Sequence, residues 1–345
     1  MSTVNVAIVG ATGAVGTKII EKLLERNFPS SSIKLLASKR SAGSVIEVDG
    51  NQYIVEETVP ESFDNVDIAF FSAGGSISKQ FAEEAVKRGA VVIDNTSAFR
   101  MTESIPLVVP EVNSSALKEH KGIIANPNCS TIQMVTALEP IREKFGLGRV
   151  IVSTYQAVSG AGADAIDELE KQSEQFTNRQ EIDAKLLPTG AGEKFYPIAF
   201  NAIPQIDAFD SSGYTLEELK MINETKKIFN MSELSVSATC VRIPVVSGHS
   251  ESVYFEVDQN NITVDDIRSA LSHAPGIVVQ DDTTTQTYPM PLLSEGKDHV
   301  FVGRLRKDPD HPAGFHMWVV TDNLLKGAAL NSVQIAEALL AMDQK

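Results

Sequence analysis

The stretch Val4-Asn-Val-Ala-Ile-Val9-Gly10-Ala-Thr-Gly13-Ala-Val-Gly16 decides the fold of the N-terminal part of this chain. Its first six residues are mostly apolar and predict a buried β-strand, and an amphipathic helical pattern follows over residues 15–26. The glycines between them allow a tight turn whose backbone can approach a pyrophosphate at the helix N-terminus. Strand, glycine turn and helix in this order predict a dinucleotide-binding unit.

Beyond this unit, short apolar runs alternate with helical patterns as far as about residue 126, which is typical of a parallel α/β sheet. After residue 150 the runs are longer and alternate with period two, which predicts a mixed or antiparallel sheet. Strands are expected at 4–9, 33–37, 66–71, 91–94, 122–125, 150–158, 236–246, 252–257 and 300–306. Helices are expected at 15–26, 79–88, 163–176, 214–229 and from about Asn323 to Met342.

The composition predicts a folded, acidic, two-domain protein. The chain has 345 residues, 43% hydrophobic and 22% charged, which is ordinary for a globular protein and long for one core. A net charge of −15 argues against nucleic acid or an anionic membrane as a partner. Two cysteines, no basic leader and no apolar run of membrane-spanning length make a reducing cytoplasm the expected location.

The segment after the second expected strand favours NADP as the cofactor. Residues Ser38-Lys39-Arg40-Ser41 stand where an NAD-preferring site places a carboxylate against the ribose. Their hydroxyl and cationic donors suit a 2′-phosphate instead. A second turn of small residues, Ser72-Ala73-Gly74-Gly75, follows another expected strand and should lie at the same edge of the sheet.

Cys129 is the candidate nucleophile. It lies in Asn126-Pro-Asn-Cys129-Ser-Thr131, between an apolar strand and an expected helix, and a helix N-terminus favours the thiolate. The free N–H groups there could also bind an oxyanion. Cys240 lies inside an apolar strand and is expected to be an inert buried thiol.

His249 is the candidate acid/base for that thiol. It follows Arg242-Ile-Pro-Val-Val-Ser-Gly248 in a turn between two expected strands, where proline and glycine fix the backbone around a polar side chain. The remaining histidines are not clustered with other metal ligands, so no metal site is expected.

Taken together, the motifs resemble those of the aspartate-semialdehyde dehydrogenase family over nearly the whole chain. The matching segments are Gly10–Gly16, Ala37–Gly43, Asp94–Arg100, Asn126–Thr131, Tyr155–Gly162, Glu217–Lys220 and Arg242–Glu251.

The resemblance implies an α/β protein with a Rossmann-like NADP-binding domain and a mixed α+β catalytic and dimerisation domain, like that of glyceraldehyde-phosphate dehydrogenase. The first domain would span 1–128 and be completed by a C-terminal helix at 322–345, and the second would span 129–321. The implied reaction is the reversible, NADPH-dependent reduction of β-aspartyl phosphate to aspartate semialdehyde and phosphate, in lysine, threonine and methionine biosynthesis. A cytoplasmic homodimer or homotetramer is implied as well.

The same resemblance assigns the chemical roles. Cys129 would attack the acyl phosphate, expel phosphate and carry the acyl group as a thioester. His249 would act as acid/base, and Gln156 would orient the acyl group or a water beside the sulfur.

Five further residues are implied to bind the substrate. Arg242 would hold the α-carboxylate with its fork of N–H donors, and Glu217 would meet the α-ammonium. Lys220 and Arg100 would bind the phosphate, and Asn128 would complete the set. From the spacing alone, Lys220 could equally form only a surface ion pair with Glu217.

The implied cofactor contacts come from several segments. Where many relatives have lysine after the Ser-Ala-Gly turn, this chain has Ser44, which removes one possible cation near the 2′-phosphate. The expected contacts are Gly10, Thr12, Gly13, Ala14, Val15, Ser38, Arg40, Ser41, Ser72, Ala73, Gly74, Ser159, Gly160, Asn323 and Gln334.

Two alternatives stay open from the residues alone. An N-acetyl-γ-glutamyl-phosphate reductase uses the same cysteine and histidine chemistry, but its substrate has no free ammonium for Glu217 to bind. A non-catalytic NADP-binding regulator would have no need to keep Cys129, His249 and Gln156 together.

Overall fold

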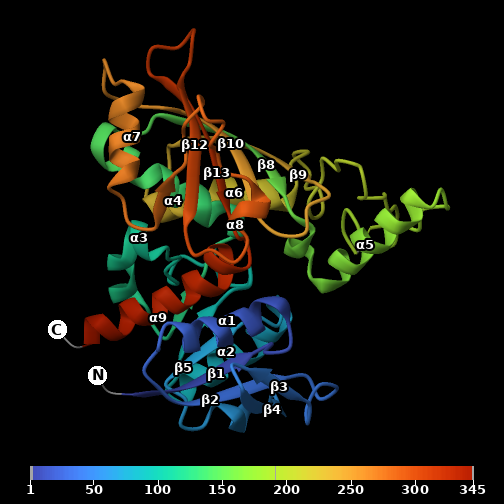
Figure 1. Ribbon diagram of the computed structural model, residues 1–345. Coiled ribbons are helices and arrows are strands. Elements are labelled where there is room, and N and C mark those ends of the chain that lie inside the picture. The colour runs from blue at the N-terminus through green and yellow to red at the C-terminus, as the bar shows by residue number, and fades with distance from the viewer. Residues whose placement is uncertain (1–2, 191, 344–345) are drawn as a thin grey trace. The chain divides into compact units, whose positions relative to one another are not determined.

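Two β-sheets organise the part of the chain that the structure describes, one with seven strands and one with six. The computed structural model describes residues 3–190 and 192–343 (Figure 1). Contacts within the chain divide it into an N-terminal unit, which runs to Asn128 and takes in the segment from Ala328 onward, and a central unit, Cys129–Gly327. Each unit contains one of the two sheets.

The seven-stranded sheet has the order β3-β4-β2-β1-β5-β6-β7. All neighbouring pairs are parallel except β3 and β4. Because β2 and β5 flank β1 on opposite sides, the strand order reverses at β1, and ligands of such sheets bind at this switch point. The strands are β1 (Val4–Val9), β2 (Ser30–Ala37), β3 (Val45–Val48), β4 (Asn51–Glu57), β5 (Ile68–Phe71), β6 (Val91–Asp94) and β7 (Ile123–Ala125).

Helices cover both faces of this sheet, which explains the unbroken apolar run of β1. Val6 and Ile8 join a core with α1 (Ala14–Glu25) and α9 (Leu330–Asp343). Ala7 and Val9 join a second core with α2 (Gly75–Lys87) on the other face. Alternate side chains of the strand therefore enter two different cores, so none of them needs to be polar.

The hairpin of β3 and β4 is an element that the sequence analysis missed. Asp49 and Gly50 connect its strands, and both have positive φ angles, 49° and 75°. An Asp-Gly pair of this kind is the usual two-residue turn of a β-hairpin. β4 also pairs in parallel with β2, so its last residue, Glu57, lies beside Ala37.

The six-stranded sheet has the order β11-β12-β13-β10-β8-β9. It is mixed, as expected, since β8–β9 and β11–β12 are parallel and the other pairs are antiparallel. The strand expected at 236–246 is shorter than predicted, because β9 ends at Arg242 and the chain turns at Gly248, whose φ is +91°. The strands are β8 (Arg149–Gln156), β9 (Ser235–Arg242), β10 (His249–Glu256), β11 (Ile277–Val279), β12 (Val300–Lys307) and β13 (Gly314–Thr321).

Helix α4 (Cys129–Phe145) is the central helix of this unit. It packs against β10, β12 and β13 and against two other helices, and most of its residues are buried. Its companions are α6 (Leu216–Phe229), which packs on β9, and α7 (Val264–Ser272). The short helices of the chain are α3 (Pro110–Asn113) and α8 (Pro291–Ser294), with 3₁₀ turns at Pro60–Phe63, Ser114–Glu119 and Val158–Ala161.

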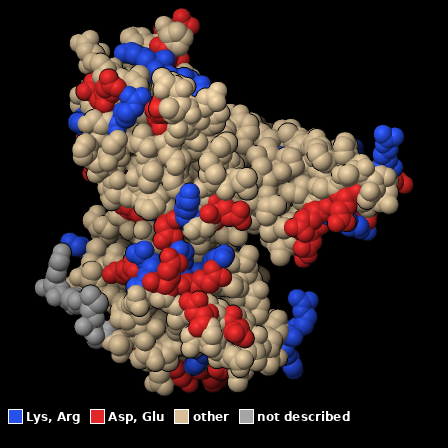
Figure 2. Space-filling view, in the orientation of Figure 1, with Lys and Arg blue, Asp and Glu red and all other residues tan. Residues whose placement is uncertain are grey.

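Helix α5 (Ala163–Thr177) extends away from the six-stranded sheet within the central unit (Figure 1). It has a small core of its own, to which Val158, Leu169 and Ile198 contribute. Acidic side chains gather on this helix (Figure 2). Part of the chain's negative charge is therefore carried on α5.

The last helix begins later than predicted. Leu325–Ala329 forms a π-helix, and α9 starts only at Leu330. Asp322 is the physical reason, because its carboxylate accepts the N–H groups of Leu324 and Leu325 at 2.9 and 3.2 Å and holds this segment in a turn. Asn323, expected inside the helix, lies in that turn. None of the described helices is long and apolar enough to cross a membrane.

Candidate active site

The turn after β1 is held directly against the turn after β5. Gly10 has a φ of +88°, and a Cβ there would lie 2.8 Å from the Ala73 nitrogen. A Cβ on Gly16 would lie 2.1 Å from the Gly10 carbonyl oxygen. Both positions therefore require glycine, one for the close approach of two turns and the other for the packing of α1 on its own turn.

Helix α1 opens without a side-chain cap. Its N-cap residue is Gly13, and the first turn has no acidic side chain. The backbone N–H groups of Ala14 and Val15 begin this helix, and the positive end of its dipole lies at the switch point of the sheet. The geometry suits a phosphate group.

A cavity of about 360 Å³ opens beside this turn. Eight of the predicted cofactor residues line it, whereas Ala14, Val15 and Gly74 are adjacent in sequence but are not in its lining. Gln334 lies on α9 and donates to Glu111 at 3.1 Å. The lining is Gly10, Thr12, Gly13, Ala37, Ser38, Lys39, Arg40, Ser41, Glu57, Thr58, Ser72, Ala73, Ile77 and Phe81.

Glu57 is the charged residue of this cavity that sequence reasoning missed. The segment after β2 has no carboxylate, but β4 pairs with β2 and brings Glu57 to the same edge. Thr58 fixes this junction, because its hydroxyl and N–H both donate to the Ala37 carbonyl, at 3.0 and 2.9 Å. The Asp49-Gly50 turn signal could have identified the hairpin, and with it Glu57.

Cys129 is the first residue of α4 and is partly exposed. The π-helix that precedes α9 lies against it, since a Cβ on Gly327 would be 2.9 Å from the Cys129 Cβ. The thiol therefore occupies a helix N-terminus whose other side is covered by a glycine. Cys240, in contrast, is fully buried in β9, and burial together with Glu217 raises its pKa, as fits an inert thiol.

His249 is the first residue of β10 and is fully buried. The Ala157 N–H donates to its Nδ1 at 3.0 Å, so the neutral ring carries its proton on Nε2. Nε2 has no hydrogen-bond partner among the described residues. Burial, assisted by the positive charge of Arg242, lowers the pKa of His249 to about 3. The ring is therefore neutral at physiological pH and presents an N–H donor.

Arg242 ends β9 beside Gln156, its register partner on β8. Its Nη1 donates to the Ala157 carbonyl at 2.7 Å, and its Nε has no partner among the described residues. A Cβ on Gly160 would lie 3.0 Å from that Nη1 and 3.2 Å from His249 Nε2. Two buried nitrogens that lack partners among the described residues thus belong to side chains that converge beneath one glycine. Burial lowers the pKa of Arg242, and Glu217 and the Cys129 thiol partly offset this.

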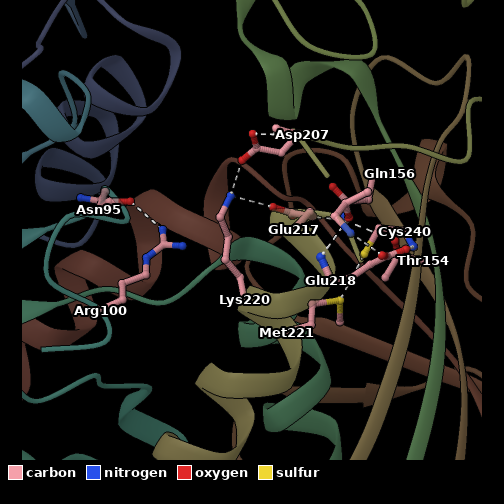
Figure 3. Close-up of polar contacts among 12 residues, drawn as sticks. Asn95, Arg100, Thr154, Gln156, Asp207, Glu217, Glu218, Lys220, Met221 and Cys240 are labelled. Carbon is pink, nitrogen blue, oxygen red and sulfur yellow. Dashed lines mark hydrogen bonds and ion pairs between the residues drawn. The ribbon is translucent and has the colours of Figure 1, made fainter. Parts of the chain in front are cut away.

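Lys220 on α6 lies between two carboxylates (Figure 3). Its Nζ is 3.0 Å from Asp207 Oδ2 and 3.2 Å from Glu217 Oε2. Burial favours the neutral amine, but Glu217 and Asp207 outweigh it and raise the pKa of Lys220. Gln156 Nε2 donates to Glu217 Oε1 at 3.2 Å. The i,i+3 ion pair is present, but it belongs to a larger, partly buried network that includes Asp207. No sequence motif identifies Asp207.

Arg100 and Asn128 belong to the N-terminal unit and are both buried. Arg100 Nε donates to the Asn126 carbonyl at 2.9 Å, and its Nη2 donates to the Asn95 carbonyl at 2.8 Å. These bonds fix the segment that leads into Cys129. Asn331 of α9 anchors the same segment, since its amide donates to Asn126 Oδ1 at 2.7 Å.

Ser159 and Asn323, both predicted to contact the cofactor, bond to each other in the central unit. Asn323 Nδ2 donates to Ser159 Oγ at 3.0 Å, and the Gly248 N–H donates to Asn323 Oδ1 at 2.9 Å. The turn before His249 is thereby tied to the loop of Gly160. In the described part of the chain, no group of three or more His, Cys, Asp or Glu side chains could hold a metal ion.

Comparison with known proteins places these features in one family. A family model described as semialdehyde dehydrogenase, NAD binding domain, matches residues 5–120, and another, described as semialdehyde dehydrogenase, dimerisation domain, matches residues 138–326. Aspartate-semialdehyde dehydrogenase of Bacillus subtilis (strain 168) is 62% identical over 335 residues, covering 97% of both chains. The Aquifex aeolicus enzyme of the same name is 53% identical over 339 residues, again covering 97% of both.

Solved structures agree. Aspartate semialdehyde dehydrogenase II from Vibrio cholerae matches with a TM-score of 0.93 and 47% identity, covering 99% of both chains. A structure of that enzyme complexed with ASA matches with a TM-score of 0.93 and 46% identity, also covering 99% of both. The Candida albicans enzyme with NADP matches with a TM-score of 0.75 and 27% identity, covering 99% of both.

Proposed function

Because this chain belongs to the aspartate-semialdehyde dehydrogenase family and has its activity, we propose that it reduces β-aspartyl phosphate with NADPH through a thioester on Cys129. One observation carries the assignment of the site. His249 Nε2 and Arg242 Nε are buried and have no hydrogen-bond partner in the part of the chain that the structure describes, and Arg242 is close enough to Cys129 for their charges to interact. A substrate that offers oxygen acceptors would satisfy both nitrogens.

Arg242 and Glu217 would select the amino-acid end of the substrate. Arg242 keeps Nη1 on the Ala157 carbonyl, which orients the guanidinium and leaves other donors for the α-carboxylate. Glu217 would meet the α-ammonium, although it first has to share its oxygens with Gln156 and Lys220. Lys220 and Arg100 would bind the phosphate, and Asn128 would also contact the substrate. An N-acetyl-γ-glutamyl-phosphate would have no ammonium for Glu217 to bind, which argues against the reductase alternative. The 62% identity to an aspartate-semialdehyde dehydrogenase argues against both the reductase and the non-catalytic regulator.

The chemistry would start with the Cys129 thiolate attacking the acyl carbon. A C–S bond forms, the bond from that carbon to the phosphate oxygen breaks, and phosphate leaves. His249 Nε2–H would donate to the carbonyl oxygen as negative charge develops on it, and Gln156 would orient the acyl group. When the C–S bond later breaks, the thiolate is restored and the aldehyde departs.

The N-terminal unit would hold NADP. A bound nicotinamide would supply the hydride that reduces the acyl carbon. The uncapped turn of Gly10, Thr12 and Gly13 fits its pyrophosphate, and Ser38, Arg40 and Ser41 offer donors to a 2′-phosphate. We also propose contacts from Ala14, Val15, Ser72, Ala73, Gly74, Ser159, Gly160, Asn323 and Gln334.

A homodimer or homotetramer is proposed to assemble through the central unit. The family model that matches residues 138–326 is described as a dimerisation domain, and those residues lie inside this unit. We propose that the protein acts in the cytoplasm.

Phosphate-dependent reduction of NADP⁺ by aspartate semialdehyde tests the function. Activity is expected with aspartate semialdehyde, with little or none from its N-acetylglutamate counterpart, and Cys129→Ala should abolish it. Cys240→Ala is the matched control and should keep activity, because that thiol is buried in β9. Near-normal turnover by Cys129→Ala would reject the mechanism, and a preference for the N-acetylated aldehyde would reject the substrate.

A further inference from the structure

Two rows of polar side chains cross the six-stranded sheet on one face. The first row contains His249, Gln156 and Arg242, at the ends of their strands. The second row lies one step further into the sheet, where Glu251 on β10 pairs with Thr154 on β8, which in turn pairs with Cys240 on β9. Residues two apart on a strand share a face, so Glu251 lies directly behind His249.

Helix α4 places a matching pair against this face. Cys129 and Gln133 are one helical turn apart and therefore share a face of α4, which packs on β10. Gln133 is fully buried. The residue behind the nucleophile is thus an amide, and the residue behind the acid/base is a carboxyl group.

The Glu251 carboxyl group is fully buried and has no counter-ion among the described residues. Burial raises its pKa well above the ordinary value, and only the Gln133 amide opposes this. Neither oxygen of Glu251 and neither polar atom of the Gln133 amide makes a hydrogen bond of ordinary geometry within the described chain. A lone buried carboxylate is strongly unfavourable, so Glu251 takes up a proton.

A protonated carboxyl group and an amide are complementary. The acid O–H can donate to Gln133 Oε1, and the amide N–H can donate to the acid carbonyl. The neighbours of Glu251 in the sheet are uncharged, so they do not favour loss of this proton. Thr154 and Val319 are its partners on the two adjacent strands, and Cys240 lies beyond Thr154. A charged Glu251 would instead favour protonation of His249, two residues away, which the Ala157 N–H opposes at Nδ1.

We propose that Glu251, as a neutral acid, and Gln133 form a brace between β10 and α4 that positions Cys129 against His249. The inference rests on the proposed roles of Cys129 and His249 and adds two positioning residues behind them. It assigns neither residue to contact with substrate. Their contribution is to hold the reactive thiol and imidazole in register across two elements.

Variants at both positions separate a polar brace from simple packing. Glu251→Gln keeps a neutral donor and acceptor and should retain kcat close to that of the unaltered enzyme. Glu251→Leu and Gln133→Leu should each lower kcat by about tenfold to a hundredfold, as misplaced reacting groups do. The KM for NADP⁺ should change little. The double variant Glu251→Leu/Gln133→Leu should regain thermal stability but not kcat, because two apolar residues pack without holding a register.

Alkylation of Cys129 gives a readout that does not depend on turnover. In a Cys240→Ala background the chain has one thiol, so the rate of its reaction with iodoacetamide can be followed across pH. The leucine variants should lower the alkylation rate or move its pH midpoint. Glu251→Gln should reproduce the rate and the midpoint of the unaltered protein. Gln172→Leu is the matched control, because Gln172 is equally buried in the same unit. Its amide donates to Glu168 on α5 and to the Asp183 carbonyl.

Infrared difference spectra test the protonation state. The spectrum of the unaltered protein minus that of Glu251→Gln should show the carbonyl band of a protonated carboxylic acid at pH 7. A carboxylate band instead would overturn the proposal, as would Glu251→Gln being as impaired as Glu251→Leu, or full kcat in the double variant. Turnover by Cys129→Ala would instead reject the proposed function. The Glu251 and Gln133 variants keep Cys129, so their results test the brace and not that function.

Discussion

The His249 ring has one defined tautomer, with its proton on Nε2. Because the Ala157 N–H occupies Nδ1, a second ring proton would have to displace that bond, and burial beside Arg242 disfavours the cation further. The imidazole is therefore a neutral donor at Nε2. A charged imidazole would repel the nearby guanidinium of Arg242.

Acid should weaken the fold through His249. Its pKa in the folded chain, about 3, is below the ordinary value of 6.5, so the unfolded chain binds the extra proton more readily. The stability it contributes is complete above pH 6.5 and is lost as the pH falls from 6.5 toward 3. His249→Asn, which keeps an acceptor for the Ala157 N–H, should flatten this dependence in urea unfolding measured at several pH values.

The exposed His299 supplies the comparison for that experiment. His299→Asn should leave the pH dependence of the free energy of unfolding as it is in the unaltered protein. An unchanged slope in His249→Asn would contradict the account of the ring.

Glu57 opposes the basic residues of the cofactor cavity. Its carboxylate lines the same cavity as Arg40 and would repel a 2′-phosphate. Glu57→Gln should lower the KM for NADP⁺ by about twofold to fivefold, the scale of an exposed charge interaction, and affect NAD⁺ less. Glu56→Gln is the neighbouring control, since Glu56 is exposed on β4 but is not in the lining. Equal effects of both variants on both cofactors would show that Glu57 does not select between them.

At the scale of elements, the backbone of the π-helix Leu325–Ala329 lies against the start of α4. A π-helix is uncommon and often marks a functional site. Gly327 has no Cβ, and this lets its backbone approach Cys129. The position of the thiol therefore depends on a segment almost two hundred residues away in sequence.

Gly327→Ala should impair catalysis more than stability. The new Cβ would lie 2.9 Å from the Cys129 Cβ, so either the thiol or the π-helix must shift. A displacement of this kind should lower kcat by about a hundredfold. Gly190→Ala is the control, because its Cβ would meet nothing closer than 3.7 Å. An unaltered kcat in Gly327→Ala would contradict this expectation, because the π-helix and α4 could then move apart without affecting catalysis.

The sequence predicted elements whose signals are local. The run at Val4–Val9, the glycine turn and the helix that begins at Cys129 all depend on neighbours in the chain, and the structure confirms them. Asp207 and Gly327 could not be recognised in this way, and the local signals at the Asp49-Gly50 turn and in Arg242–Glu251 do not show what Glu57 and Glu251 pair with in the sheets. A partly buried ion pair brings Asp207 to its site and the packing of the π-helix brings Gly327 to its site, and neither contact leaves a periodic or motif signal of its own.

At the scale of the whole molecule, acidic side chains set the net charge, and a few basic side chains are proposed to bind the anionic ligands. The chain carries a net charge of −15, and acidic side chains gather on α5, yet its substrate and cofactor are anionic. The basic residues proposed to bind them are few, and each is oriented by its own contacts: Arg242 by Ala157, Arg100 by Asn126, and Lys220 by two carboxylates. Local cations of this kind can bind anions in an acidic protein.

Mass spectrometry of the trapped enzyme tests most directly whether Cys129 carries the acyl group. With aspartate semialdehyde and NADP⁺ but no phosphate, the acyl group has no acceptor and should accumulate as a thioester. After acid quenching and digestion, the peptide containing Cys129 should carry the mass of one aspartyl group, and the peptide containing Cys240 should not. A modified Cys240, or an unmodified Cys129 in an enzyme that has formed NADPH, would contradict the account.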